Sequence, residues 1–376
     1  MVLLLGNYAL DQQQSMRRFG AMMLEGLTGR GIKAELVVPQ PVLGNVRLFG
    51  QFIQKWLGYI DKYLFFPYQL RKRIRTTEQP LVHICDHSNA VYVNKCRPAP
   101  VVVTCHDLLA VRGGLGEETD CPATFAGRLL QRWILIGLRK AEAIVCDSEA
   151  TATDANRLLG EDNSGQWVNM VPLGLSYPYH PISDSEATSR LAELPSLDLA
   201  QPFALHVGSN LRRKNRDAVL RIIATIQEQW KGQIVFAGEP LSRDLKQLAT
   251  RLGIGDRVVQ VSNLSNELLE ALYNKALALV YPSRFEGFGW PVIEAQACGC
   301  PVISSNSGPL PEVGGDAALL HPVEDEAGFA ADLLRLMNPA ERSRWAEKSL
   351  SNARRFSTSR MIDEYAAIYR KLGASV

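Results

Sequence analysis

Short, nearly continuous apolar runs alternate with helical patterns from one end of the chain to the other. Runs that are apolar at consecutive positions are typical of parallel strands covered on both faces. The strands predicted in the first half are Val2–Leu5, Ala34–Val38, Leu81–Ile84, Val101–Thr104, Ala143–Cys146 and Val168–Val171. Those in the second half are Phe203–Val207, Gln233–Ala237, Arg257–Gln260, Ala276–Tyr281, Pro301–Ser304 and Ala318–Leu320. The repeated strand–helix order predicts an α/β protein with doubly wound sheets.

The pattern breaks once, in residues 175–200, where three prolines and several Ser and Asp residues interrupt the period. We therefore predict two Rossmann-like domains that face each other across a cleft. The predicted parts are an N-terminal domain (1–180), a linker (181–200), a C-terminal domain (201–356) and a last helix (357–376) that crosses back to the N-terminal domain. Because such sheets bind ligands beyond the carboxyl ends of their strands, the cleft is the expected site.

Composition narrows the class of protein without identifying it. The 376 residues are 46% hydrophobic and 21% charged, which is an ordinary globular balance. The formal charge of +2 argues against nucleic acid as a partner, and no apolar stretch approaches the roughly 18–20 residues that span a bilayer. The start, Met1–Gly6, predicts a buried strand and not a signal peptide. Seven scattered cysteines without a CxxC pair indicate reduced, buried thiols and a cytoplasmic protein.

The segment Tyr281–Glu294 (YPSRFEGFGWPVIE) is the most informative in the chain. It follows a predicted strand, and Pro291 suits the first turn of a helix, so Glu286 falls in the loop and Glu294 one turn inside the helix. A helix start suits an anionic diphosphate, whereas a carboxylate one turn in suits a vicinal diol such as a ribose. Taken alone, Glu286 could be a solvated loop charge and Glu294 a favourable charge near the helix start. Their spacing across a Gly-rich turn favours a binding site formed by both.

A second cluster, Gly208–Asn215 (GSNLRRKN), also joins a strand end to a helix. Three consecutive cations at a helix N-terminus are unfavourable by about 0.3–1 kcal/mol each, so helix formation does not explain their presence. A diphosphate-binding site would explain it, because Arg binds a diphosphate as a fork and Lys binds it as a point charge. The alternative is a solvated basic loop.

Together these motifs resemble the GT4 family of retaining glycosyltransferases, whose fold is GT-B. The resemblance rests on the EGFGxxxxE run from Glu286 to Glu294 with its continuation to Ile303, on residues 311–318, and on Gly208 with Arg213-Lys214-Asn215. It is closest over residues 203–335 and weaker in the first half, where TCHDL 104–108, CDSE 146–149 and VPLG 171–174 carry it. It implies an N-terminal acceptor-binding domain and a C-terminal nucleotide-sugar-binding domain.

The resemblance also implies roles for individual residues. Arg213 and Lys214 are expected to bind the donor diphosphate and neutralise the leaving group, and Glu294 to hold the ribose hydroxyls. Glu286 is expected to hold the donor sugar. Other expected donor-binding residues act mainly through their backbone: Gly208, Asn263, Leu264, Gly287, Phe288 and Gly289. His106, at the end of an N-domain strand, is expected to face the anomeric centre; the alternative is a strand-end histidine that caps the next turn, and Asp107 is expected to support that turn.

Two departures from the family pattern bear on the substrate. Ser209 stands where many relatives have an Arg, and the Arg next to Lys214 resembles a branch rich in mannosyltransferases. GDP-mannose is therefore the favoured donor and a UDP-sugar the alternative. The second departure is the loop Gly6–Ser15, which lacks the frequent Gly-Gly, so that its polar side chains, and not a phosphate loop, are expected near substrate.

The implied reaction moves a hexose, mannose favoured, from a nucleotide-diphosphate sugar to a glycan or lipid-linked acceptor in polysaccharide biosynthesis. Cations and a helix N-terminus stabilise the charge that builds on the diphosphate, so neither a metal nor a cofactor is expected. The nearest acidic motif of the metal-binding kind, Asp184-Ser185-Glu186, falls in the predicted linker. Retention follows from the resemblance, with same-face departure and attack as the working hypothesis. Domain closure is expected to bring His106 toward the donor.

Residues 49–75 pose a separate question. Their aromatic side chains repeat at a helical spacing from Phe49 to Tyr63, and six cations surround them against one acid, Asp61. Such a segment suits a core-facing helix with a basic end, which the base rate favours. It also suits an anionic membrane surface, which would make the protein peripheral at the inner face of the membrane.

Two other functions remain open at this point. A GT-B-fold sugar-nucleotide epimerase would bind the same donor but release no nucleoside diphosphate. A non-catalytic nucleotide-sugar-binding subunit is the other, and Arg213, Lys214, Glu286 and Glu294 argue against it. No GxGxxG follows a strand, which disfavours a dehydrogenase.

Overall fold

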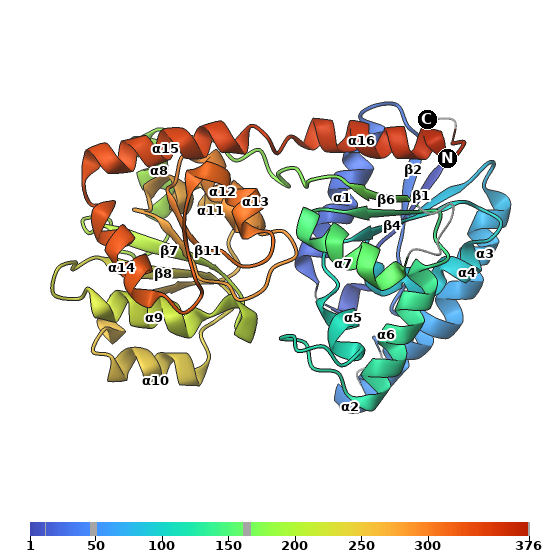
Figure 1. Ribbon diagram of the computed structural model, residues 1–376, viewed down its shortest axis with the longest axis horizontal. Helices are drawn as coiled ribbons and strands as arrows, with labels where there is room; N and C mark the ends of the chain where they lie inside the picture. The colour runs from blue at the N-terminus through green and yellow to red at the C-terminus, as the bar shows by residue number, and fades with distance from the viewer. Residues whose placement is uncertain (12, 46–50, 161–166, 375–376) are drawn as a thin grey trace. The chain divides into compact units, whose positions relative to one another are not determined.

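Two parallel six-stranded sheets organise the chain, each in its own compact unit. The structure is a computed structural model that describes residues 1–11, 13–45, 51–160 and 167–374; of residues 51–53 and 55 it describes the backbone. Unit 1 comprises Met1–Ser176 and Thr358–Val376, and unit 2 comprises Tyr177–Ser357. Each of the twelve predicted apolar runs overlaps a strand, so the predicted doubly wound α/β fold is confirmed (Figure 1).

In unit 1 the strands follow the order β2-β1-β3-β4-β5-β6. Their bounds are β1 Val2–Leu5, β2 Ala34–Val37, β3 Leu81–Ile84, β4 Val101–Cys105, β5 Ala143–Cys146 and β6 Trp167–Met170. The α-helices are α1 Gln14–Thr28, α2 Gln51–Ile60, α3 Phe66–Thr76, α4 Val93–Cys96, α5 Leu109–Gly114, α6 Phe125–Leu138, α7 Glu149–Leu159 and α16 Thr358–Lys371. Three shorter turns are the 3-10 helices η1 Ala9–Asp11 and η3 His87–Tyr92 and the π-helix η2 Asp61–Phe65, which joins α2 to α3.

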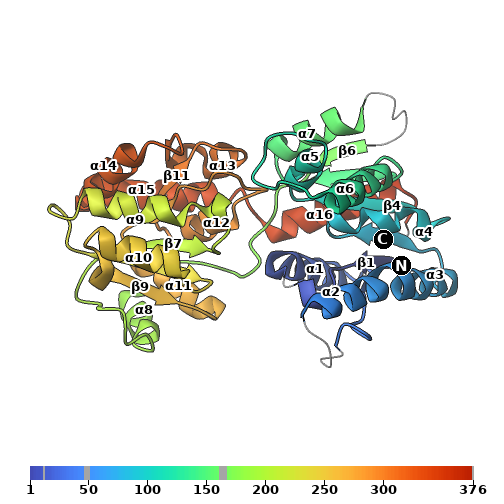
Figure 2. The ribbon, with the colours of Figure 1, turned by 90° about the horizontal axis from the view of Figure 1, so that it is seen from below.

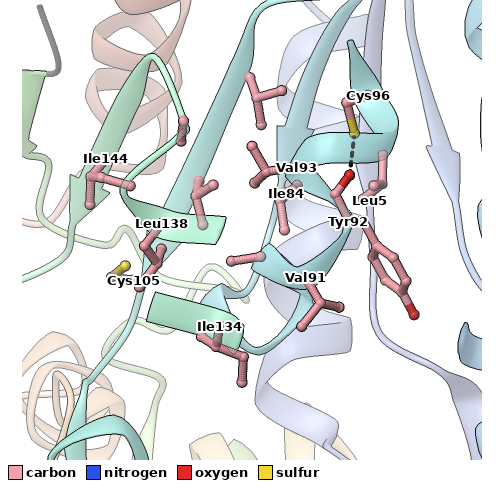
Figure 3. Close-up of a cluster of buried hydrophobic side chains, with 14 of the residues drawn as sticks. Leu5, Ile84, Val91, Tyr92, Val93, Cys96, Cys105, Ile134, Leu138 and Ile144 are labelled. Atoms are coloured by element: carbon pink, nitrogen blue, oxygen red, sulfur yellow. Dashed lines mark hydrogen bonds between the residues drawn. The ribbon is translucent and has the colours of Figure 1, made fainter. Parts of the chain in front are cut away.

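The core of unit 1 lies between the sheet and the helices α3, α4 and α6 with the turn η3. Figure 3 shows part of it, in which strand residues meet side chains from η3, α4 and α6: Leu5, Ile84, Cys105 and Ile144 from the strands, and Val91, Tyr92, Val93, Cys96, Ile134 and Leu138 from the helices. All these side chains are at most 3% exposed. Continuous burial on both faces of the strands explains why their apolar runs do not alternate.

In unit 2 the order is β12-β11-β10-β7-β8-β9. The strands are β7 Phe203–Gly208, β8 Gln233–Gly238, β9 Val258–Val261, β10 Leu279–Tyr281, β11 Val302–Ser305 and β12 Ala318–His321. The α-helices are α8 Asp184–Leu191, α9 Arg216–Thr225, α10 Arg243–Arg251, α11 Asn266–Lys275, α12 Trp290–Ala297, α13 Leu310–Gly314, α14 Glu326–Arg335 and α15 Pro339–Ala353. The 3-10 turns are η4 Arg212–Lys214, η5 Gly255–Arg257 and η6 Gly315–Ala317.

The predicted linker differs from what the structure contains. Residues 181–200 include the helix α8, and unit 2 already begins at Tyr177. Ser183 caps α8, because its side chain accepts a hydrogen bond from the backbone N–H of Glu186. Ala187 and Leu191 are buried, and Arg190 binds the buried Glu270 of α11 at 2.8 Å. The helix is therefore stabilised by packing within unit 2, which its prolines and polar composition concealed.

The last helix, α16, belongs to unit 1 although it follows all of unit 2 in the chain. It lies alongside α1 in both views (Figures 1 and 2), where Arg30 pairs with Asp363 at 2.5 Å. Two buried tyrosines tie it to the sheet: the Tyr365 hydroxyl lies 2.8 Å from Thr104 Oγ1, and the Tyr369 hydroxyl lies 2.8 Å from Nδ1 of His83.

The contact between α1 and α16 leaves no room for a side chain at Gly26. A Cβ at this position would lie 2.5 Å from Cγ1 and 2.6 Å from Cδ1 of Ile362. Helix propensity alone would favour Gly26→Ala by about 1 kcal/mol. We expect the variant instead to lose about 1–3 kcal/mol of unfolding free energy from overpacking, measured by urea denaturation. In an Ile362→Ala background, which removes the clashing atoms, Gly26→Ala should cost little or stabilise; equal effects in both backgrounds would contradict this account.

Candidate active site

The strand order of unit 2 reverses between β10 and β7, and both loops that follow these strands carry the motifs singled out above. Gly208 ends β7 and leads into the Arg212–Lys214 turn, and Glu286 lies in the loop after β10. A reversal of strand order leaves a crevice at the carboxyl edge of a parallel sheet, where ligands of such folds bind. The topology thus explains why residues more than 70 positions apart meet.

A buried ion-pair cluster joins these two loops. Lys214 Nζ lies 2.7 Å from Oε1 of Glu286, and Arg213 Nη1 lies 2.9 Å from Oε2. Lys214 also donates to the Tyr281 hydroxyl at 2.7 Å, and that hydroxyl donates to Glu286 Oε1 at 2.8 Å. The Glu286 side chain is only 6% exposed. We call Arg213, Lys214, Tyr281 and Glu286 the cation cluster.

The cation cluster is charged and carries one positive charge more than negative. Burial opposes ionisation of Glu286, but Lys214 and Arg213 outweigh it and lower the pKa of this carboxyl to about 2. Burial lowers the pKa of Lys214, and Glu286 opposes that effect. Two cations held by one carboxylate leave capacity for a further anion at the same place.

Glu294 lies near the cation cluster on α12, one turn from the helix start as predicted. It is 3% exposed and accepts a hydrogen bond at 2.9 Å from the hydroxyl of Tyr273 on α11. Three of the four side chains on which the sequence prediction depends, Arg213, Lys214 and Glu286, thus meet in the cation cluster, and Glu294 lies on the helix that follows the Glu286 loop.

The loop after β7 differs in detail from the expectation. The three cations form their own turn, η4, and Asn215 then takes a left-handed conformation (φ 54°) before α9 begins at Arg216. Arg216 is buried and donates to the carbonyl oxygens of Gly208 and Glu239, so it holds the loop after β7 in place. Arg216 continues a run of polar residues, so the sequence alone does not single it out.

The other expected donor-binding residues lie at the same edge of the sheet. Gly289 has φ 103° and caps α12; a Cβ there would lie 2.7 Å from Leu310. Phe288 is buried against Phe356, with ring centroids 5.8 Å apart, and Gly287 lies between Phe288 and the cation cluster in the chain. Asn263 and Leu264 follow β9, two strands away from β7, with Asn263 in a left-handed conformation.

In unit 1, His106 directly follows β4 and is held at both ring nitrogens. Nδ1 lies 3.0 Å from Asp147 Oδ2, and Nε2 lies 3.0 Å from the carbonyl oxygen of Cys85. Phe19 packs edge-on against the ring at 4.7 Å. Burial disfavours the charged imidazole, but Asp147 outweighs this and raises the pKa of His106. Asp107 accepts a hydrogen bond from the backbone N–H of Leu109, as expected of a residue that supports the turn.

The strand order of unit 1 reverses between β1 and β3, and a polar cluster lies there. Buried Asp86 accepts hydrogen bonds from Asn7 Nδ2 at 2.5 Å and from the backbone and hydroxyl of Ser88 at 3.0 and 2.6 Å. Burial opposes ionisation of Asp86, but His87, Ser88 and Asn7 outweigh it and lower its pKa. Asn7 belongs to the loop Gly6–Ser15, so at least one of the loop's polar side chains lies at this edge.

Acidic residues elsewhere have structural partners. Asp184 lies 2.6 Å from Lys275, and Glu186 lies 2.5 Å from Arg190. Across the part of the chain that the structure describes, no three His, Cys, Asp or Glu side chains gather in a way that could hold a metal ion. All seven cysteines are free thiols, and all except Cys121 are buried.

Comparison with known families covers both units. "Glycosyl transferases group 1" matches residues 193–351, and "Glycosyltransferase Family 4" matches residues 18–175. Among curated proteins, O-antigen chain mannosyltransferase B of Escherichia coli is 29% identical over 248 residues, which are 63% of this chain and 64% of that protein. The chain spans less than two thirds of the length of the first curated relatives that it matches.

Solved structures share the architecture at low identity. Sucrose-phosphate synthase from Thermosynechococcus elongatus has a TM-score of 0.75 at 21% identity, covering 100% of this chain and 99% of its own. HepE of Anabaena in complex with UDP-glucose has a TM-score of 0.73 at 15% identity, covering 98% and 99%. The fold is therefore the two-domain Rossmann-like fold of GT-B glycosyltransferases.

Tyr273 should position Glu294. Tyr273→Phe removes one hydrogen-bond donor from a buried carboxylate, and we expect it to lower the unfolding free energy by about 1–3 kcal/mol. The measurement is urea denaturation of the full chain. Tyr68→Phe is the matched control, because Tyr68 is 75% exposed and its variant should stay within about 0.5 kcal/mol. Equal stabilities of the two variants would show that the Tyr273 hydroxyl does not hold Glu294.

Proposed function

This chain belongs to the GT4-like glycosyltransferases of GT-B fold, and on that premise we propose that it transfers a hexose from a nucleotide-diphosphate sugar to a glycan or lipid-linked acceptor. Anomeric configuration is retained and no metal takes part. The observation that carries the proposal is the cation cluster at the strand reversal of unit 2.

The cation cluster fits a donor diphosphate by charge and by position. Arg213 and Lys214 bind the diphosphate, and the start of α12 adds the positive end of a helix dipole at the same edge of the sheet. Glu286 holds both cations in place, so that little reorganisation of Arg213 and Lys214 precedes binding. Glu286, with the backbone of Gly287–Gly289, then takes the hydroxyls of the sugar, and Glu294 takes those of the ribose.

The same groups act on the reaction. When the bond between the sugar and the diphosphate breaks, negative charge builds on the departing phosphate oxygens. Arg213 and Lys214 stabilise this charge more in the transition state than in the ground state, which is the role that a metal ion fills elsewhere. The acceptor hydroxyl attacks from the face that the diphosphate leaves, and this preserves the configuration. His106 of unit 1 faces the anomeric centre of the transferred sugar.

Two observations favour mannose as the sugar of the donor. The name of the mannosyltransferase from Escherichia coli supports mannose, and the Arg213-Lys214 arrangement supports the same branch, so GDP-mannose is favoured. The UDP-glucose complex of HepE keeps a UDP-sugar as the alternative.

Location is also part of the proposal. Free thiols at all seven cysteines support a reducing compartment such as the cytoplasm. None of the helices among the described residues has both the length and the apolar character needed to cross a membrane. A lipid-linked acceptor would require contact with the inner face of a membrane, for which residues 49–75 are the first candidate.

Lys214→Ala should abolish most of the turnover while leaving the fold intact. Removing one preorganised cation from the leaving group costs about 10²–10³-fold in kcat. The assay is release of nucleoside diphosphate from GDP-mannose, with the far-ultraviolet circular dichroism spectrum as the check on folding. Arg212→Ala is the matched control, because Arg212 occupies the same turn but is exposed and lies outside the cation cluster. Full activity in Lys214→Ala would remove Lys214 from the mechanism.

Donor identity is tested by thermal shift. We expect GDP-mannose to raise the melting temperature more than UDP-glucose, and the rise to be the same with and without EDTA. At a donor concentration of 100 Kd the stabilisation is about 2.7 kcal/mol, enough to shift the transition visibly. No shift with either donor would contradict the proposed site, and a shift that EDTA removes would contradict metal independence.

A further inference from the structure

Large apolar side chains are exposed in one region of unit 1. Nine of them lie on α6 or on the continuous helical segment α2–η2–α3, each between 37% and 78% exposed: Trp56, Ile60, Leu64, Phe65, Tyr68, Phe125, Leu129, Trp133 and Ile136. The sequence pattern indicates only residues 49–75, either as a core-facing helix or as a segment that binds a membrane surface. The structure divides that segment, because Phe66, Leu70 and Ile74 are core, whereas Trp56 and Tyr68 are exposed. Phe49 lies outside the described residues.

The helix α6 has two distinct faces. Ile134, Leu135 and Leu138 are buried in the core of unit 1. Phe125, Leu129, Trp133 and Ile136 are spaced by four, four and three residues, so they form one outward stripe and are 78%, 52%, 40% and 48% exposed. A surface helix of a monomeric protein normally presents polar residues here, so this stripe calls for a partner.

Aromatic contacts join the stripe on α6 to the segment α2–η2–α3. The ring of Trp133 lies 5.6 Å from that of Tyr63, Tyr63 lies 5.9 Å from Tyr59, and Tyr59 lies 5.6 Å from Trp56. The two exposed stripes are therefore continuous. We call the nine exposed side chains together with these two tyrosines the aromatic face.

Cations predominate among the charges around the aromatic face, although exposed Asp11 pairs with Lys62 of η2 and exposed Glu78 follows α3. Exposed cations flank it on and just beyond both helices: Arg71, Lys72, Arg75, Arg128, Arg132, Arg139 and Lys140. The described residues of α6 include no acid, and the single acid of α2–η2–α3, Asp61, is buried and accepts hydrogen bonds from Tyr8, Leu43 and Gly44. A partner that covers this face must therefore be apolar and carry negative charge.

We propose that the aromatic face docks the protein on an anionic lipid bilayer, with α6 lying in the interface. Trp, Phe and Leu side chains flanked by Arg and Lys are the residues that interfacial helices use. A second copy of the chain is the less suitable occupant, because a two-fold interface would place the same cations against each other. For its biological purpose the inference rests on the proposed lipid-linked acceptor, but the docking itself requires no turnover.

Flotation with vesicles tests the proposal. The full chain should float with phosphatidylcholine vesicles that contain 30% phosphatidylglycerol, less at high salt, and hardly with phosphatidylcholine alone. The variant pair Leu129→Glu and Ile136→Glu should reduce the bound fraction at least fivefold. Met337→Glu is the matched control, because Met337 is 47% exposed in unit 2, and it should float as the parent does.

The possible outcomes of the flotation experiment can be distinguished from one another. Melting temperatures of the variants within a few degrees of the parent establish that the fold is intact. Undiminished flotation of the Leu129→Glu and Ile136→Glu pair overturns the proposal. So does a concentration-dependent dimer that these substitutions dissociate in sedimentation experiments, without any flotation of the parent. Flotation is measured without nucleotide sugar, so a chain that floats but releases no nucleoside diphosphate contradicts the proposed function and leaves this inference standing.

Discussion

Glu286 is held by two cations at once, and the arrangement of the candidate site depends on this buried ion pair. Removing both cations would leave the buried charge of Glu286 uncompensated, and breaking a buried pair in this way typically costs about 3–5 kcal/mol. Lys214 and Glu286 therefore stabilise each other's place in the structure, and they come from loops at opposite sides of the strand reversal. Because one carboxylate neutralises two cations only in part, the same contact that stabilises the loops also leaves a positive site open to an anion.

In both sheets the candidate site residues lie where the strand order reverses, but the two sets of side chains differ in chemical type. In unit 2 the strand reversal gathers arginine and lysine, which suit phosphate oxygens. In unit 1 the reversal gathers Asn7 and Asp86, with His106 and Asp147 following the neighbouring strands. Amides, carboxylates and an imidazole suit hydroxyl groups. The side chains at the two reversals thus support the proposed division into a donor-binding and an acceptor-binding domain.

The sequence predicted what local patterns control. All twelve apolar runs overlap strands, because burial on both faces leaves a continuous hydrophobic signal. The spacing of Glu286 and Glu294 located the loop and helix correctly, because Gly289 and Pro291 mark the helix start. The helix α8 was missed, since it is stabilised by contacts with α11. Tyr273 and Asp147 were missed for the same reason: their partners, Glu294 and His106, are 21 and 41 residues away, and no local period records such contacts.

The place of α16 has a consequence for how the chain is made. Unit 1 needs Tyr365 and Tyr369 to satisfy Thr104 and His83 in its sheet, yet these tyrosines follow all of unit 2 in the chain. During synthesis, unit 2 can therefore finish folding while unit 1, which precedes it, still lacks one of its covering helices. The order of translation and the order of completion are reversed, so unit 1 reaches its final packing only after α16 has been translated.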